Sequence, residues 1–141
     1  MVVRMIEFHL DARSGVAPYM QLIQQVRHAM RLGLLQQGDK LPTVKDVVAR
    51  IAINPNTVLK AYRELEYEGL VQPRPGLGTF VTRTLGGESE LAAHEPLRRD
   101  LDGWLAKARD AGLDDESIEA LFVSTFRQFS EERAGRAGRR G

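Results

Sequence analysis

Amide, hydroxyl and basic side chains gather in one stretch of this sequence, residues 43–78, together with several glycines. An asparagine amide can bond two atoms of an adenine edge, and a threonine can bond a base or contact a thymine methyl. Lysine, arginine and the free N–H groups at a helix start bind phosphate. These residue types indicate nucleic-acid recognition, provided that the fold presents them on one side. The candidates are Thr43, Lys45, Asn54, Asn56, Thr57, Lys60, Arg63, Arg74, Gly76 and Gly78.

Catalytic or metal-binding chemistry has little support in the sequence. The chain has no cysteine, and its histidines, His9, His28 and His94, are widely spread. No nucleophile elbow, phosphate loop or metal-ligand spacing occurs. The acidic run Asp114-Asp115-Glu116 is typical of a helix start, where carboxylates complement the helix dipole. We therefore expect no enzymatic activity, no cofactor and no metal.

The candidates need helices and a turn to position them. Residues 5–10 alternate weakly and predict a short strand, and Pro18 opens a helix with an apolar stripe over residues 19–30. Thr43 and Asp46 have the spacing of a capping box at the start of a second, short helix. Asn54-Pro55 starts a third helix after a minimal connection, and Gly69 ends it. Two β-prone pieces around the turn-rich stretch 72–78 then predict a hairpin.

This order predicts a mainly α fold with a small β-hairpin: a winged helix-turn-helix domain over residues 1–84. In such domains the first turn of the second helix of the motif meets base edges in the major groove. Asn56 and Thr57 occupy that turn, Lys45 is placed to contact the phosphate backbone, and Arg74 lies at the tip of the wing. Taken singly, each of these residues is also ordinary on a solvated helix or turn. Their concentration in one motif favours the binding interpretation.

The rest of the chain has a different composition. Residues 1–87 carry 11 basic and 7 acidic residues, and residues 88–132 carry 5 basic and 12 acidic ones. Residues 133–141 carry four arginines and no acidic residue. The net charge of +1 is therefore the sum of a basic first part, an acidic second part and a basic end. Residues 88–132 predict a two-helix region for dimerisation, and residues 133–141 predict a disordered basic tail. Two helices alone cannot bury their aromatic surface, so we expect a dimer interface. It is formed by Leu97, Leu101, Trp104, Leu105, Leu121, Phe122, Phe126 and Phe129.

Residues 18–82 resemble the DNA-binding domain of GntR-family transcriptional regulators, and the short second part resembles the YtrA-like subgroup. The resemblance rests on the segments PYMQLI (18–23), GDKLPT (38–43), NPNTV (54–58), AYRELE (61–66), EGL (68–70) and GLGTFV (76–81). It implies a homodimer that binds double-stranded operator DNA, mostly as a repressor and often near ABC-transporter genes. Many relatives carry arginine where this chain has Lys45, and other subgroups carry arginine at the sites of Pro55 and Leu59.

Two further expectations complete the sequence-based prediction. The alternative function is a winged-helix protein-interaction module that uses the aromatic C-terminal helices to bind another protein. No run of about 18 apolar residues occurs, and the N-terminal segment carries Glu7 and Asp11 where a signal peptide would stay apolar, which predicts a cytoplasmic protein without a membrane span. The sequence leaves open whether the helical region of residues 88–132 binds a small-molecule effector.

Overall fold

The chain divides into two compact units. The structure, a computed structural model, describes residues 6–85 and 90–139. The first unit is Met1–His94 and the second is Glu95–Gly141. The division thus falls later than Gly86-Gly87, the composition boundary in the sequence, and those two glycines lie outside the described residues.

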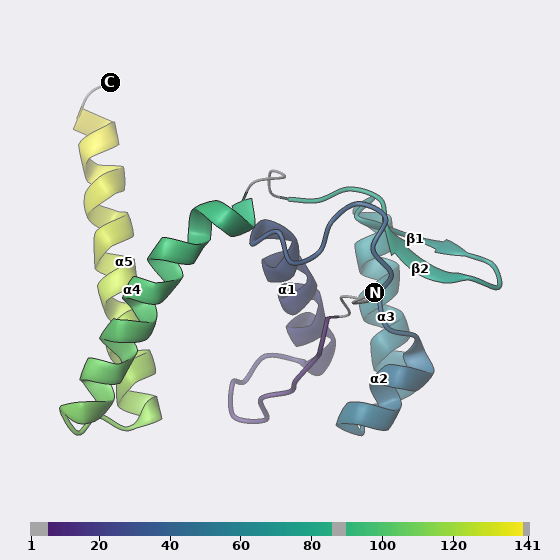
Figure 1. Cartoon of the computed structure of the whole chain (residues 1–141), viewed down its shortest axis with the longest axis horizontal. Helices are drawn as coiled ribbons and strands as arrows, with labels where there is room; N and C mark the ends of the chain where they lie inside the picture. Colours follow the sequence, from purple (N-terminus) through teal and green to yellow (C-terminus); the bar gives the residue numbers. More distant parts are fainter. Residues whose placement is uncertain (1–5, 86–89, 140–141) are drawn as a thin grey trace. The chain divides into compact units, whose positions relative to one another are not determined.

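The first unit is a winged helix-turn-helix, as the sequence predicts (Figure 1). Its helices are α1 (Pro18–Arg31), α2 (Val44–Ile51) and α3 (Pro55–Tyr67). A hairpin of β1 (Val71–Arg74) and β2 (Gly78–Val81) follows α3 directly. The mainly helical fold with one small hairpin is therefore confirmed.

The hairpin is anchored to the chain segment that precedes α2. Its strands pair antiparallel, with Val71 opposite Val81 and Arg74 opposite Gly78. On the other side of β2, Lys40 forms a bridge with Phe80, and the Leu41 N–H donates to the Thr79 carbonyl at 2.9 Å. Because β2 is hydrogen-bonded on both sides, the wing is held close to the start of the helix-turn-helix motif.

One apolar core joins these elements. Each helix contributes the stripe that its periodicity predicts, and the first residue of β1 and the last of β2 close the core from the hairpin side. Its most completely buried side chains are Leu22, Val26, Met30, Leu35, Leu41, Val58, Leu65, Leu70, Val71 and Val81. Burial of each large side chain stabilises the fold by roughly 1.5–3 kcal/mol before entropy is counted.

The strand predicted for residues 5–10 is wrong for residues 6–10, and Met5 lies outside the described residues. Phe8 is buried in the core, but no strand lies beside this segment. Its backbone is hydrogen-bonded by side-chain amides of α1 instead. Gln25 accepts from the His9 N–H at 3.1 Å and donates to its carbonyl at 2.7 Å, and the buried Gln21 bonds both backbone groups of Asp11. Two glutamines thus supply the donor and acceptor pairs that a neighbouring strand would offer.

The second unit contains most of α4 (Glu90–Asp110) and all of α5 (Asp115–Arg139), which run antiparallel around Gly112 (Figure 1). Gly112, with a φ of 94°, lies just after the end of α4, where glycine tolerates the left-handed conformation. The disorder predicted for residues 133–141 is wrong for residues 133–139, which continue α5. Alanine and arginine are good helix formers, and arginines complement the C-terminal end of a helix dipole.

No helix in the described ranges is both long and apolar enough to cross a membrane.

Candidate nucleic-acid interface

Hydrogen bonds between side chains and backbone fix the turn between α2 and α3. The Thr43 hydroxyl accepts from the Asp46 N–H at 3.1 Å, and the Asp46 carboxylate accepts from the Thr43 N–H at 3.4 Å. Hydrogen bonding of the Asp46 carboxylate to the Thr43 side chain, and then to the Thr43 N–H, holds the pKa of Asp46 below its ordinary value. Ala52 ends α2 in the left-handed conformation (φ 48°, ψ 46°). Asn54 then caps α3 by accepting from the Asn56 N–H at 2.8 Å.

The first turn of α3 presents polar groups that the protein itself does not use. Asn56 is exposed and Thr57 is half-buried, and neither side chain has a hydrogen-bond partner within the described residues. The Asn54 side chain differs, because its oxygen is occupied by the cap. Asn56 and Thr57 are therefore the side chains of this turn that are free to bond a base edge.

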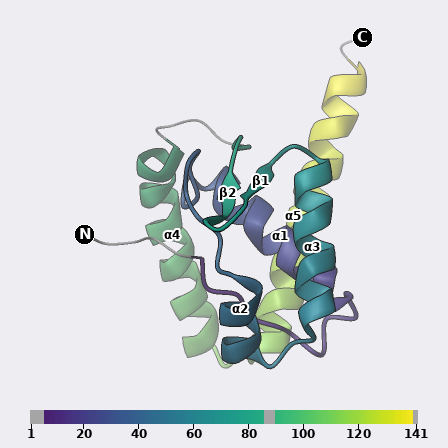
Figure 2. The same ribbon diagram turned by 90° about the vertical axis from the view of Figure 1, so that its right-hand side faces the viewer.

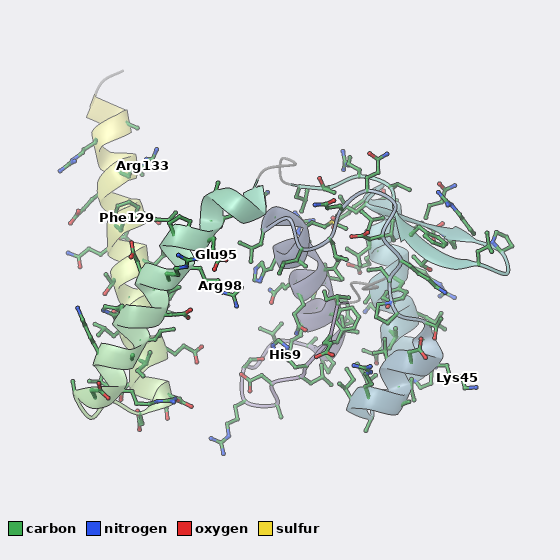
Figure 3. The ribbon with its side chains drawn as sticks, viewed as in Figure 1. His9, Lys45, Glu95, Arg98, Phe129 and Arg133 are labelled. Atoms are coloured by element: carbon green, nitrogen blue, oxygen red, sulfur yellow. The ribbon has the colours of Figure 1, made fainter. Side chains whose placement is uncertain are left out.

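The basic candidates of the helices fall into two kinds. Lys60 is held by an aromatic ring, because its Nζ lies 3.9 Å from the ring centroid of Tyr19 in α1. Lys45 and Arg63 are exposed, and neither forms an ion pair in the described part of the chain. Figure 3 shows Lys45 pointing away from α2. Lys60 is thus pre-positioned, whereas Lys45 and Arg63 are free to follow a phosphate backbone.

The wing carries one predicted cation, Arg74, and a second cation that the sequence did not single out, Lys40, lies against it from the segment before α2. The Arg74 guanidinium lies 4.7 Å from the Phe80 ring centroid, which holds it against the hairpin. Gly76 occupies the turn with a φ of 75°. At Gly78, with a φ of 126°, an added Cβ would lie 2.6 Å from Cε of Lys40. The Lys40 side chain therefore lies across the wing at Gly78. These two residues are 38 positions apart, so no local sequence pattern indicates the contact.

These elements share one side of the first unit. With the hairpin side turned to the viewer, α2, α3 and the two strands lie together at the front (Figure 2). The first turn of α3 thus offers an amide and a hydroxyl group without intramolecular partners among the described residues, and cations lie on α2, α3 and the wing. That combination suits hydrogen bonding in a groove with phosphates on both sides.

Two tyrosines near this surface have opposite environments. Tyr62 is buried and donates its hydroxyl to the Pro42 carbonyl at 2.6 Å, which ties α3 to the start of α2. Burial raises the pKa of Tyr62 well above its ordinary value. Tyr67, at the end of α3, is 94% exposed and therefore takes no part in the core.

The predicted dimer residues are largely uncovered in the single chain. Among the described residues of α4 and α5, only Ala108 and Ile118 are buried, and Trp104 is half-buried. Phe122 and Phe126 stack on each other with ring centroids 6.3 Å apart. The exposed members of the predicted interface are Leu97, Leu101, Leu105, Leu121, Phe122, Phe126 and Phe129.

The acidic run at the start of α5 has structural partners. Asp114 accepts from the Ser117 N–H at 2.8 Å, and hydrogen bonding to the Ser117 side chain and then to this N–H lowers the pKa of Asp114. Asp115 pairs with Arg109 at 2.7 Å. The described ranges contain no group of three or more histidine, aspartate or glutamate side chains placed to hold a metal ion. Capping and pairing account for this cluster.

Comparison with known proteins finds relatives of this chain, and the family match lies within the first unit. Residues 18–81 match the model of bacterial regulatory proteins of the gntR family. The HTH-type transcriptional repressor YtrA of Bacillus subtilis is 44% identical over 73 residues, which are 52% of this chain and 56% of that protein. The HTH-type transcriptional regulator YhcF of the same organism is 33% identical over 107 residues, 75% of this chain and 87% of that protein.

A solved structure is similar as well. YtrA from Sulfolobus acidocaldarius, a GntR-family transcription factor, is 26% identical with a TM-score of 0.50 over 67% of this chain and 96% of that one. The match to the Bacillus YtrA spans about half of that repressor's length. All three relatives are named as regulators of transcription and none as an enzyme. The chain belongs to the GntR family of bacterial regulatory proteins and is a transcriptional regulator whose winged helix-turn-helix is the DNA-binding domain.

Proposed function

We propose that the protein is a dimeric repressor that recognises a specific operator sequence in double-stranded DNA in the cytoplasm. The observation that carries the proposal is the uncommitted first turn of α3, where Asn56 and Thr57 have no partner among the described residues. Inserted in the major groove, these side chains would read bases, while Lys45, Lys60 and Arg74 would bind phosphates on either side. The name of the Bacillus relative, a repressor, supports this direction of control.

The proposal includes dimerisation because the second unit has exposed aromatic and aliphatic side chains. Phe126 and Phe129 are each about 60% exposed, next to several exposed leucines. Exposed aromatic surface of this kind marks a protein interface. Two heads joined there would read two half-sites roughly 34–36 Å apart, the spacing of one helical turn of DNA. Each head is only modestly basic, so paired heads supply the affinity that one lacks.

The docking of α3 is tested by two alanine variants. A duplex selected from a random library by the full-length protein serves as the specific site, and an unrelated duplex serves as the non-specific one. Asn56→Ala should weaken specific binding about 10- to 100-fold and relax discrimination at one base pair, because it removes a base contact. Lys60→Ala should weaken binding to both duplexes to a similar extent, since it removes a phosphate contact.

The matched control is Lys107→Ala, an exposed lysine in the last turn of α4. It should leave both affinities unchanged when measured by fluorescence anisotropy. Full affinity in both Asn56→Ala and Lys60→Ala would rule out the proposed docking of α3. A footprint upstream of the protein's own gene then locates the operator and tests whether the controlled operon encodes an ABC transporter.

A further inference from the structure

Helix α5 begins with Asp115, Glu116 and Glu119, and its middle carries exposed aromatic side chains beside Arg127. Its end carries Arg133 and Arg136 together with Glu131 and Glu132, so the change of charge along the helix belongs to one face of it. Phe126 lies at the centre, 61% exposed. Figure 3 shows Phe129 and Arg133 projecting from successive turns of this helix. A helix face with an acidic side chain at one end, a basic side chain at the other and an aromatic side chain between them is complementary to the same face of a helix that runs in the opposite direction.

The spacing of the charges makes this complementarity specific. Glu119 and Arg133 each lie seven residues from Phe126, in opposite directions. Seven residues are close to two full turns of an α-helix, so all three side chains share one face. Glu119 and Arg133 are exposed, and neither forms an ion pair within the part of the chain that the structure describes. The face is therefore apolar at its centre with an unpaired charge of opposite sign two turns to either side.

We infer that α5 pairs antiparallel with α5 of a second copy of this chain, with Phe126 near the two-fold axis and Glu119 opposite Arg133 of the partner subunit. The symmetry repeats this ion pair, so each dimer contains it twice. A parallel arrangement in register would instead place Glu119 against Glu119 of the partner subunit and Arg133 against Arg133 of the partner subunit. Like charges in contact are destabilising, so the charge pattern selects the antiparallel pairing. The inference rests on the proposed homodimer and gives it an orientation and a register.

Charge reversal tests the pairing. Glu119→Arg alone and Arg133→Glu alone should each weaken the dimer about 10- to 100-fold, because each converts two attractive contacts per dimer into repulsive ones. The double variant Glu119→Arg/Arg133→Glu should return to within about threefold of the original dimer, since it restores both pairs with exchanged signs. Sedimentation equilibrium of the full-length chain measures these constants.

The matched control is Glu131→Arg, which reverses one charge on the same helix. Glu131 is exposed and lies five residues from Phe126, about 140° around the helix. It should leave the dimer constant unchanged. Single reversals without effect would overturn the inference, because parallel helices keep the same number of like-charge contacts after each reversal.

Cysteine cross-linking gives an independent readout in a chain that has no cysteine of its own. A mixture of Glu119→Cys and Arg133→Cys chains should cross-link with a short bismaleimide, and each variant alone should not. In the antiparallel register, residue 119 lies about 21 Å from its own copy. Cross-linking of each variant with itself would contradict the antiparallel register but would still be consistent with a homodimer. A monomeric original protein at tens of micromolar would overturn both and would favour a different protein as the partner of this face.

Discussion

At the residue scale, packing decides which polar groups are available for DNA. Asn54 and Asn56 are two positions apart and identical in type, yet Asn54 caps α3 with its side chain, whereas the Asn56 side chain has no partner among the described residues. Lys45 and Lys60 likewise differ, since Lys60 lies over the Tyr19 ring. Residue type alone nominated all four. In the structure Asn54 and Lys60 have intramolecular partners, whereas the side chains of Asn56 and Lys45 have none among the described residues.

Tyr62 illustrates a polar residue whose role is to hold the motif together. Tyr62→Phe removes the hydroxyl that donates to the Pro42 carbonyl and leaves that acceptor without its partner. We expect the free energy of unfolding to fall by about 1–2 kcal/mol, measured by urea denaturation. Tyr67→Phe is the matched control, because Tyr67 is 94% exposed and should change stability little. Equal stability of Tyr62→Phe and the original protein would contradict a structural role for this bond.

The same residue predicts a pH dependence with a defined sign. Burial raises the pKa of Tyr62, so the folded protein retains a proton that the unfolded chain releases above pH 10.0. The contribution of Tyr62 to the free energy of unfolding is therefore fully present below pH 10.0 and is lost as the pH rises above it. Urea titrations from pH 9 to 11 should therefore show a steeper loss of stability for the original protein than for Tyr62→Phe. Parallel curves would disprove the linkage.

At the element scale, the turn of the helix-turn-helix contains a conformation that its residue does not favour. Ala52 ends α2 with a φ of 48°, where glycine avoids the steric cost of a Cβ. Ala52→Gly should therefore stabilise the protein by about 0.5–1 kcal/mol, offset in part by the greater freedom of glycine in the unfolded chain. Ala49→Gly, at an exposed position inside α2, should destabilise by about 1 kcal/mol. The same sign for both variants in urea denaturation would contradict this explanation.

Elements with local signals were predictable from the sequence, and elements that depend on distant partners were not. Thr43 and Asn54-Pro55 mark both helix starts, and the structure has a cap at each. The segment around Phe8 looked like a strand, because nothing nearby in sequence shows that Gln21 and Gln25 take up its backbone bonds. The contact of Lys40 with Gly78 was missed for the same reason. For the candidate site, the sequence predicted that the polar and basic residues share one side of the domain. It did not predict their contacts with other parts of the chain, such as that of Lys60 with Tyr19.

At the scale of the whole molecule, the uneven distribution of charge explains how a chain with a net charge of only +1 can bind DNA, which is a polyanion. The first 87 residues carry an excess of four positive charges, and residues 88–132 carry an excess of seven negative ones. Acidic helices are repelled by phosphates, which favours contact of the first part of the chain with DNA over contact of these helices. The arginines that end α5 offset this charge only at one end of that helix.

The salt dependence of operator binding tests whether two heads act together. Each lysine–phosphate contact releases counterions and contributes about 0.9 to the slope of log K against log salt concentration. A dimer that uses both heads contains Lys45 twice, so Lys45→Gln should reduce the slope by about 1.8. A single engaged head would lose about half as much. Lys107→Gln, an exposed lysine of α4, removes the same charge from the acidic unit and should leave the slope unchanged. Equal slopes for Lys45→Gln and the original protein would exclude Lys45 from the phosphate contacts.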